Sequence, residues 1–213
     1  MDPLSKRINS LPVSATLAMA AKARELKNQG IDIIGLSLGE PDFNTPEFIK
    51  KAAVQAVNDD WNSYSPVDGY TDLKEAICEK FKRDNKLLYK PSQIVVSTGA
   101  KQSIANVCMV LLDPGDEVLL PAPYWVSYSA IATLAEAKSI IIPSTIETDF
   151  KITPDQLDQV ITPKTKLIMF NSPNNPSGTI YSEEEYRALG KVLEKYPQIF
   201  ILSDEIYEHI NYG

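Results

Sequence analysis

Short, uninterrupted apolar segments recur through the second half of this 213-residue chain. Strands that are apolar on both faces are typical of parallel sheets, because helices cover such sheets from both sides. Segments with helical spacing of apolar residues separate these runs. The sequence therefore predicts an α/β fold with a mostly parallel sheet and helices on both faces. The expected strands cover residues 94–96, 117–120, 139–142, 166–170 and 198–202.

Helix signals also fill the first half of the chain. An N-terminal arm leads into an expected helix over 16–29, with Gly30 as its stop. Thr45 is expected to cap the next helix, which has Pro46 in its first turn and runs to Asn58. Further helices are expected from Thr71, from the turn at 97–101 to about 112, over 124–135, from Thr153, and from Ser182, whose capping box includes Glu185.

The charge balance and the cysteines argue against several classes of function. The chain has 21 Lys and Arg against 28 Asp and Glu, a net charge of -7, whereas a nucleic-acid surface needs clustered cations. Cys78 and Cys108 lie in helical patterns without metal-ligand spacing, which predicts two core thiols rather than a disulfide or a metal site. No stretch has the roughly 18 apolar residues of a membrane helix. We therefore expect a soluble, cytoplasmic protein without a nucleic-acid or membrane partner.

Residues 97–101 are the first candidate for a ligand site. In open α/β sheets, ligands bind beyond the carboxyl ends of the strands, and this turn follows the first expected strand. Gly99 lets the backbone turn sharply, the next amides can bind an anion at a helix N-terminus, and Lys101 adds a positive charge. The alternative is an ordinary strand-to-helix turn with a solvated lysine.

Later strand ends have further candidates. Trp125 follows the second strand, where its indole could stack on a planar ligand or belong to the core. Residues 171–178, rich in Asn and Pro, form a restricted turn that could hold an amide toward a ligand. Asp204 follows the fifth strand, either as a paired buried carboxylate or as a helix N-cap. His209, the one histidine, has no Ser or Cys partner motif and receives no catalytic role.

Together these motifs resemble the pyridoxal-phosphate-dependent class I and II aminotransferases of fold type I, most of all the bacterial aspartate aminotransferase subgroup. The likeness runs from about residue 4 to residue 213, in the order and spacing of the family. One motif alone would be weak evidence, whereas their joint occurrence is highly specific. The matching segments are SLGEPDF at 37–43, YSP at 64–66 with Gly69, GAKQ at 99–102, DPGDE at 113–117, PYW at 123–125, NSPNNPSG at 171–178 and SDEIY at 203–207.

The resemblance implies pyridoxal 5′-phosphate as the cofactor and a role for each residue around its ring. Asp204 would pair with the ring nitrogen. Tyr207 and Asn175 would hydrogen-bond the phenolic oxygen, and Trp125 would stack on the ring. Asp204 and Tyr207 are the implied catalytic residues of this chain, and Trp125 and Asn175 would also border the substrate.

The remaining implied contacts involve the phosphate, the substrate and a second subunit. Gly99, Ala100 and Lys101 would form the phosphate cradle. Gly39 would lie near the substrate carboxylate. Tyr64 would reach the phosphate of the neighbouring subunit, which implies a homodimer with shared active sites. The resemblance implies no metal.

The family pattern also implies how the chain is divided. Residues 1–45 would form an N-terminal arm and helix of the small domain, and residues 46–213 the major part of the cofactor-binding large domain. In the family, the Schiff-base lysine and the arginine that binds the substrate α-carboxylate both follow the motif at 203–207. We therefore expect the large domain to be truncated on its C-terminal side, and residues 1–213 alone to be inactive.

The implied reaction is transfer of an amino group from an aspartate-like or aromatic amino acid to a 2-oxo acid, in two ping-pong half-reactions. A pyridoxal-phosphate-dependent lyase of the same fold would share every motif. A second alternative is a non-catalytic, aminotransferase-like sensing domain of a transcription regulator, although a DNA-binding region usually precedes such a domain. A nicotinamide-dependent dehydrogenase has less support, because the glycine fingerprint is absent.

Overall fold

The computed structural model describes residues 3–13, 15–35, 39, 41 and 43–210. The chain divides into two compact units. The first unit comprises Met1–Leu11 and Ser97–Gly213, and the second comprises Pro12–Val96. The expected domain boundary after residue 45 stays a prediction.

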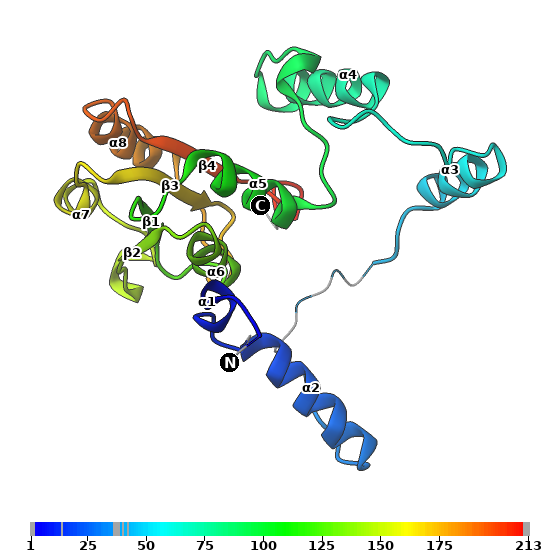
Figure 1. The fold of residues 1–213 in the computed structure, drawn as a ribbon, viewed down its shortest axis with the longest axis horizontal. Coiled ribbons are helices and arrows are strands. Elements are labelled where there is room, and N and C mark those ends of the chain that lie inside the picture. The colour runs from blue at the N-terminus through cyan, green and yellow to red at the C-terminus, as the bar shows by residue number, and fades with distance from the viewer. Residues whose placement is uncertain (1–2, 14, 36–38, 40, 42, 211–213) are drawn as a thin grey trace. The chain divides into compact units, whose positions relative to one another are not determined.

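A four-stranded parallel sheet forms the centre of the first unit (Figure 1). The strands lie in the order β2-β1-β3-β4. All three neighbouring pairs are parallel, so the predicted parallel α/β sheet is confirmed. The strands are β1 (Glu117–Pro121), β2 (Lys138–Ile142), β3 (Thr165–Asn171) and β4 (Phe200–Asp204).

Helices cover both faces of this sheet, because the inner strands alternate their apolar side chains between two cores. Val118 and Leu120 of β1 belong to one core, whereas Leu119 between them belongs to the other. All three are fully buried, and each such side chain contributes about 1.5–3 kcal/mol. The first core also contains residues of α5 (Ala100–Leu111) and α6 (Ser127–Leu134), and the second contains residues of α7 (Pro154–Val160) and α8 (Glu183–Leu193).

Two of the three predicted helix caps are confirmed. Thr153 and Ser182 each accept a backbone N–H three residues on, at 3.3 Å from Gln156 and 3.2 Å from Glu185. Both helices have the reciprocal bond of a capping box. The prediction for Thr45 is wrong: α3 (Glu47–Asn58) has Pro46 at its N-cap and no side-chain cap.

One predicted strand and the starts of two further predicted elements also differ from the structure. Residues 94–96 form no strand with any described neighbour; the Val96 N–H instead donates to the Asp68 carbonyl at 3.0 Å. The helix expected from 124 begins at Ser127, after a turn in which the Tyr128 N–H donates to the Trp125 carbonyl at 3.0 Å. The strand expected from 198 begins at Phe200, because turn bonds, including one from Ile199 N–H to the Tyr196 carbonyl, occupy the preceding backbone.

The cysteine prediction holds fully for one of the two thiols. Cys108 of α5 is completely buried, and burial raises the pKa of its thiol to about 11. Cys78 is only partly buried. Both cysteines are free thiols.

Short elements complete the described chain. In the first unit these are α1 (Lys6–Asn9) and the 3-10 turn η3 (Ile146–Thr148). In the second unit, α2 (Ala15–Asn28), α3 and α4 (Thr71–Lys80) confirm the helices predicted there. A π-helical turn η1 (Phe81–Asn85) and a 3-10 turn η2 (Pro91–Gln93) follow α4.

The turn before α4 is held by a close backbone contact and by an ion pair. Gly69 has φ +102°, and a Cβ built on it would lie 2.5 Å from Val96 Cγ2 and 2.8 Å from Val96 Cβ. Beside it, the buried ammonium of Lys74 pairs with the Asp68 carboxylate. This packing requires glycine at position 69.

We expect Gly69→Ala to lower the free energy of unfolding by about 1–3 kcal/mol, because it adds both a backbone strain and a clash. Gly30→Ala is the matched control, since φ is +80° there but nothing lies within 4 Å of the added Cβ. Urea unfolding should show the larger loss for Gly69→Ala, and a smaller loss when Val96→Ala removes the nearest atom. Equal losses in both Val96 backgrounds would contradict the clash.

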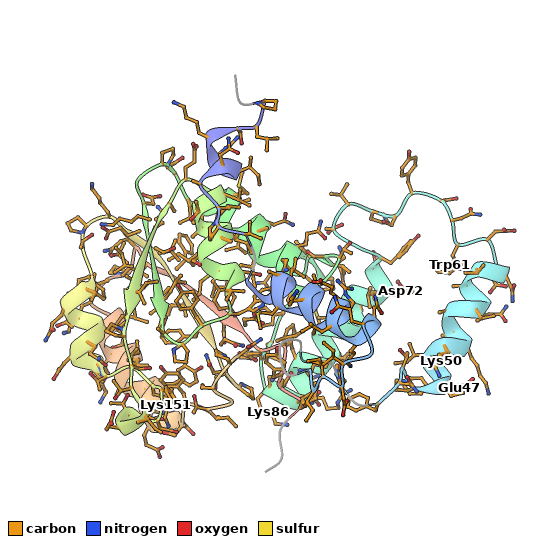
Figure 2. The ribbon with its side chains drawn as sticks, turned by 90° about the horizontal axis from the view of Figure 1, so that it is seen from below. Glu47, Lys50, Trp61, Asp72, Lys86 and Lys151 are labelled. Atoms are coloured by element: carbon orange, nitrogen blue, oxygen red, sulfur yellow. The ribbon has the colours of Figure 1, made fainter. Side chains whose placement is uncertain are left out.

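A second stability prediction concerns Glu185 at the start of α8. The Ser182 N–H and then the Lys151 ammonium, 2.9 Å from Glu185 Oε1, hold the pKa of this carboxyl below its usual 4.5 (Lys151 is labelled in Figure 2). Because the folded-state pKa is depressed, the stabilisation is present above pH 4.5 and is lost as the pH falls through the folded-state value. Glu185→Gln should therefore weaken the loss of stability between pH 7 and pH 3, measured by urea unfolding.

Glu184→Gln is the control for that measurement. It removes the same charge one residue earlier, on an exposed side chain. An equal effect of the two substitutions would show that overall charge, rather than the contacts of Glu185, sets the pH dependence.

Candidate active site at the carboxyl ends of the strands

The register of β3 and β4 places two polar residues side by side at the ends of the strands. Asn171 pairs with Asp204, and both are buried, with exposed fractions of 6% and 8%. The Asn171 Nδ2 donates to the Asp204 carbonyl at 2.9 Å. This edge is the one at which parallel α/β sheets bind ligands.

The buried carboxylate of Asp204 has a donor for each oxygen. The Tyr128 hydroxyl donates to Oδ2 at 2.7 Å, and the Ile206 N–H donates to Oδ1 at 3.3 Å. Burial, followed by the bond to Asp204, raises the pKa of Tyr128, so its hydroxyl remains a donor at neutral pH. These bonds offset the cost of burying a charge.

Asn175 and Tyr207 form a second polar group next to Asp204. The Asn175 Nδ2 donates to the Tyr207 hydroxyl oxygen at 3.0 Å. The backbone N–H of Asn175 donates to Asn171 Oδ1 at 2.7 Å, so Asn171 holds both this loop and the end of β4. The amide and the phenol together offer donors for a ligand oxygen.

The rest of the loop after β3 is held by Asn174. Its Oδ1 accepts the Ser177 N–H at 3.1 Å and the Ser177 hydroxyl at 2.8 Å, and its Nδ2 donates to the Pro123 carbonyl at 3.1 Å. These bonds make the Asn-rich loop the restricted turn that the sequence predicts.

Trp125 lies against both a tyrosine and a lysine. Its ring meets the Tyr128 ring edge to face, with 5.6 Å between centroids and 89° between planes. The Lys101 Nζ lies 4.8 Å from the indole centroid, within the range of a cation–π contact. Trp125 is half-buried.

The N-terminus of α5 is suited to an anion. Gly99 is its N-cap, at φ +85°. The Gly99 carbonyl accepts the N–H groups of Gln102 and Ser103, whereas the N–H groups of Ala100 and Lys101 lie in the first turn, which has no intrahelical partner for them. Helix dipole and free amides favour a phosphate at such a terminus.

The first unit thus contains seven of the nine predicted site residues, and direct contacts link five of them. The links run from Lys101 through Trp125, Tyr128, Asp204, Asn171 and Asn175 to Tyr207; Gly99 and Ala100 lie at the start of the same helix as Lys101.

The other two predicted residues, Gly39 and Tyr64, lie in the second unit. Both are exposed there. Their predicted contacts with substrate and with a partner subunit stay predictions. His209 is exposed, with its Nε2 3.6 Å from a Glu208 carboxylate oxygen.

The sequence interpretation assigned no role to two residues of these contacts. Tyr128 lies three residues after Trp125, and the turn in which its N–H donates to the Trp125 carbonyl at 3.0 Å brings the two rings together. Asn171 is the last residue of β3, the position at which a polar side chain points to the ligand edge. The place of Asn171 at a strand end is a signal that could have identified it, whereas the spacing of Tyr128 from Trp125 indicates only the ring contact and not the bond to Asp204.

The arrangement can hold a planar, anionic, nitrogen-containing ring. The amides at α5 suit a phosphate, the indole suits a flat ring, the carboxylate suits a protonated ring nitrogen, and the Asn175–Tyr207 pair suits a phenolic oxygen. Among the residues that the structure describes, no group of three or more His, Cys, Asp or Glu is placed to bind a metal. Over the same residues, no helix is both long and apolar enough to cross a membrane.

Comparisons with known proteins identify sequences and structures that are similar to this chain. The family model described as aminotransferase class I and II matches residues 31–213. The aspartate/prephenate aminotransferase of Nitrosomonas europaea is 53% identical over 207 residues, 97% of this chain and 52% of that protein. The aspartate aminotransferase of Bacillus subtilis is 51% identical over 210 residues, 99% of this chain and 53% of that protein. The chain thus spans about half the length of the curated relatives it matches.

Solved structures are similar over the same length. The aspartate aminotransferase of Rhizobium meliloti matches with a TM-score of 0.95 and 45% identity, over 99% of this chain and 52% of that one. The Thermus thermophilus aspartate aminotransferase with maleate matches with a TM-score of 0.95 and 41% identity, over 100% of this chain and 56% of that one.

The contacts of Asn171 generate a stability prediction. Asn171→Ala leaves the Asn175 N–H and the Asp204 carbonyl without their side-chain partner, so we expect it to cost about 1–3 kcal/mol in urea unfolding. Amide hydrogen exchange of Asn175 should accelerate while that of Ser177 stays unchanged. Asn174→Ala is the reciprocal control and should release Ser177 instead. Accelerated exchange of both amides in either variant would argue against separate roles.

Proposed function

The chain belongs to the class I and II aminotransferase family, and we propose that the whole protein transfers an amino group from an amino acid to a 2-oxo acid with pyridoxal 5′-phosphate as cofactor. The observation that best supports this proposal is the buried Asp204 carboxylate at the end of β4, in contact with Tyr128 and beside the Asn175–Tyr207 pair.

The residues present fit this cofactor by their chemistry. A carboxylate, a phenol–amide pair, an indole and the free amides of a helix N-terminus match a ring nitrogen, a phenolic oxygen, an aromatic face and a phosphate. When bound, the cofactor supplies an electron sink that stabilises negative charge at the substrate Cα.

Each residue has a distinct task in this proposal. Asp204 accepts a hydrogen bond from the ring nitrogen and keeps it protonated, because a carboxylate stabilises an adjacent positive charge. Asn175 and Tyr207 donate to the phenolic oxygen. Trp125 covers one face of the ring and excludes water from it, and the turn at 99–101 holds the phosphate.

The substrates are the finer part of the proposal. The similar proteins of Nitrosomonas europaea and Bacillus subtilis are named aspartate/prephenate and aspartate aminotransferase, which supports an aspartate-like donor; an aromatic donor is the other candidate. We also propose that Gly39 lies near the substrate carboxylate, and that the reaction runs as two ping-pong half-reactions in the cytoplasm. A product assay separates this reaction from a lyase, because transamination yields a keto acid and a new amino acid, whereas elimination yields fragments.

A homodimer is the proposed assembly, with Tyr64 reaching the phosphate of the partner subunit's site. Tyr64 is fully exposed within its own unit, which leaves its ring available for such a contact. Residues 1–213 alone are proposed to be inactive, because the Schiff-base lysine of the family follows the motif at 203–207 and Lys101 is assigned to the phosphate turn.

Replacement of Asp204 tests the proposal. In the whole protein, Asp204→Ala should lower kcat about a hundred- to a thousandfold, the usual effect of removing one preorganised electrostatic contact, and should weaken cofactor binding far less. Steady-state kinetics and cofactor titration measure the two effects. Asp204→Asn keeps the shape without the charge and should lose nearly as much turnover. Turnover like that of the wild type in either variant would refute the assigned role.

A further inference from the structure

Tyr128 contacts both Trp125 and Asp204. Its side chain is 1% exposed, so it cannot reorient without disturbing the core between α6 and the sheet. The ring meets the Trp125 indole edge to face at 5.6 Å, and the hydroxyl donates to Asp204 Oδ2 at 2.7 Å. A single rigid side chain thus links the stacking residue to the carboxylate.

The two donors to Asp204 differ in where they come from. The Ile206 N–H is only two residues away in the chain, so it is attached to the same strand end as Asp204 itself. Tyr128 is 76 residues away, on a helix that packs against the sheet. The hydroxyl is therefore the contact that fixes the carboxylate relative to α6 and to Trp125.

The hydroxyl is also a dependable donor. Burial first, and the neighbouring carboxylate second, raise the pKa of Tyr128, so the phenol stays protonated throughout the neutral range. Each carboxylate oxygen can accept a further bond beyond the one it has. Oxygen atoms held in this way still have room for the N–H of a protonated ring.

We propose that Tyr128 is a positioning residue that sets the plane of the cofactor ring through Trp125 and the place of its nitrogen through Asp204. This inference rests on the proposed function. Loss of the hydroxyl would free the carboxylate to rotate, and loss of the ring would also free the indole. Because an active-site group must be held within about 0.5 Å of its productive position, both losses should affect the protonation of the ring nitrogen.

The chain offers a matched control for the hydroxyl. Tyr196, after α8, also donates to a carboxylate, with its hydroxyl 3.1 Å from Asp158 Oδ1. That pair lies in the packing of α7 against α8, away from the carboxyl ends of the strands. Tyr196→Phe therefore removes the same kind of bond without touching the site.

The experiment compares Tyr128→Phe, Tyr128→Leu and Tyr196→Phe in the whole protein loaded with pyridoxal 5′-phosphate labelled with ¹⁵N in the ring. We expect Tyr128→Phe to move the ring ¹⁵N resonance toward the unprotonated form and to lower kcat about tenfold, the effect of one hydrogen bond to a charged group, with little change in KM. Tyr128→Leu should lose more, and should also change the fluorescence of Trp125. Tyr196→Phe should match the wild type in both resonance and kcat.

A measurement on the wild type keeps the test decisive if a Tyr128 variant does not fold. With ¹³C-tyrosine labelling, the Cζ resonance of Tyr128 should shift when the cofactor binds, and that of Tyr196 should not. An unmoved Tyr128 resonance, or a Tyr128→Phe protein with a protonated ring nitrogen and full kcat, would overturn the inference. A wild-type protein whose bound cofactor has an unprotonated nitrogen, or that binds no cofactor, would instead overturn the proposed function.

Discussion

The pairing of β3 with β4 determines the geometry of everything at the ligand edge. Five residue pairs are in register between these strands, and the last of them brings Asn171 beside Asp204. Asn171 accepts a hydrogen bond from the backbone of Asn175 in the following loop, and Asp204 accepts one from the hydroxyl of Tyr128 on α6. Two buried polar side chains, each held by hydrogen bonds from or to other elements, thus convert the regular spacing of a sheet into a fixed arrangement of functional groups.

The two cores explain why the strand ends stay in place. Successive residues of β1 and β3 alternate between the helix pairs on opposite faces, as Leu167 and Ile168 do. Both faces of these strands are buried, so rotating a strand would expose apolar side chains to water and cost free energy. The two cores therefore fix the positions of the strand ends, while the carboxyl edge of the sheet stays polar.

The sequence predicts the elements whose signals are local and leaves out those that depend on distant partners. Inner strands, helices and the caps at Thr153 and Ser182 follow from apolar spacing and short-range bonds. The segment at 94–96 has strand-like residues, yet a strand exists only with a neighbour, and none of the described strands pairs with it.

The site shows the same division. Asp204, Trp125 and Asn175 stand at strand ends, where a sequence motif can identify them. Tyr128 looks like any core tyrosine in sequence, because its significance depends on a carboxylate 76 residues away. Gly39 and Tyr64 belong to the other unit, so local patterns and the geometry of the sheet say nothing about their contacts.

The alternation along β3 has a consequence for how chains of this architecture can vary in length. One extra residue within β3 would exchange the two apolar sets between faces and shift Asn171 out of step with Asp204. Insertions and deletions are thus confined to the connections and helix ends, whereas the strands keep a fixed residue count. Changes in length during evolution can therefore alter the connections of such a protein without displacing the polar residues at its strand ends.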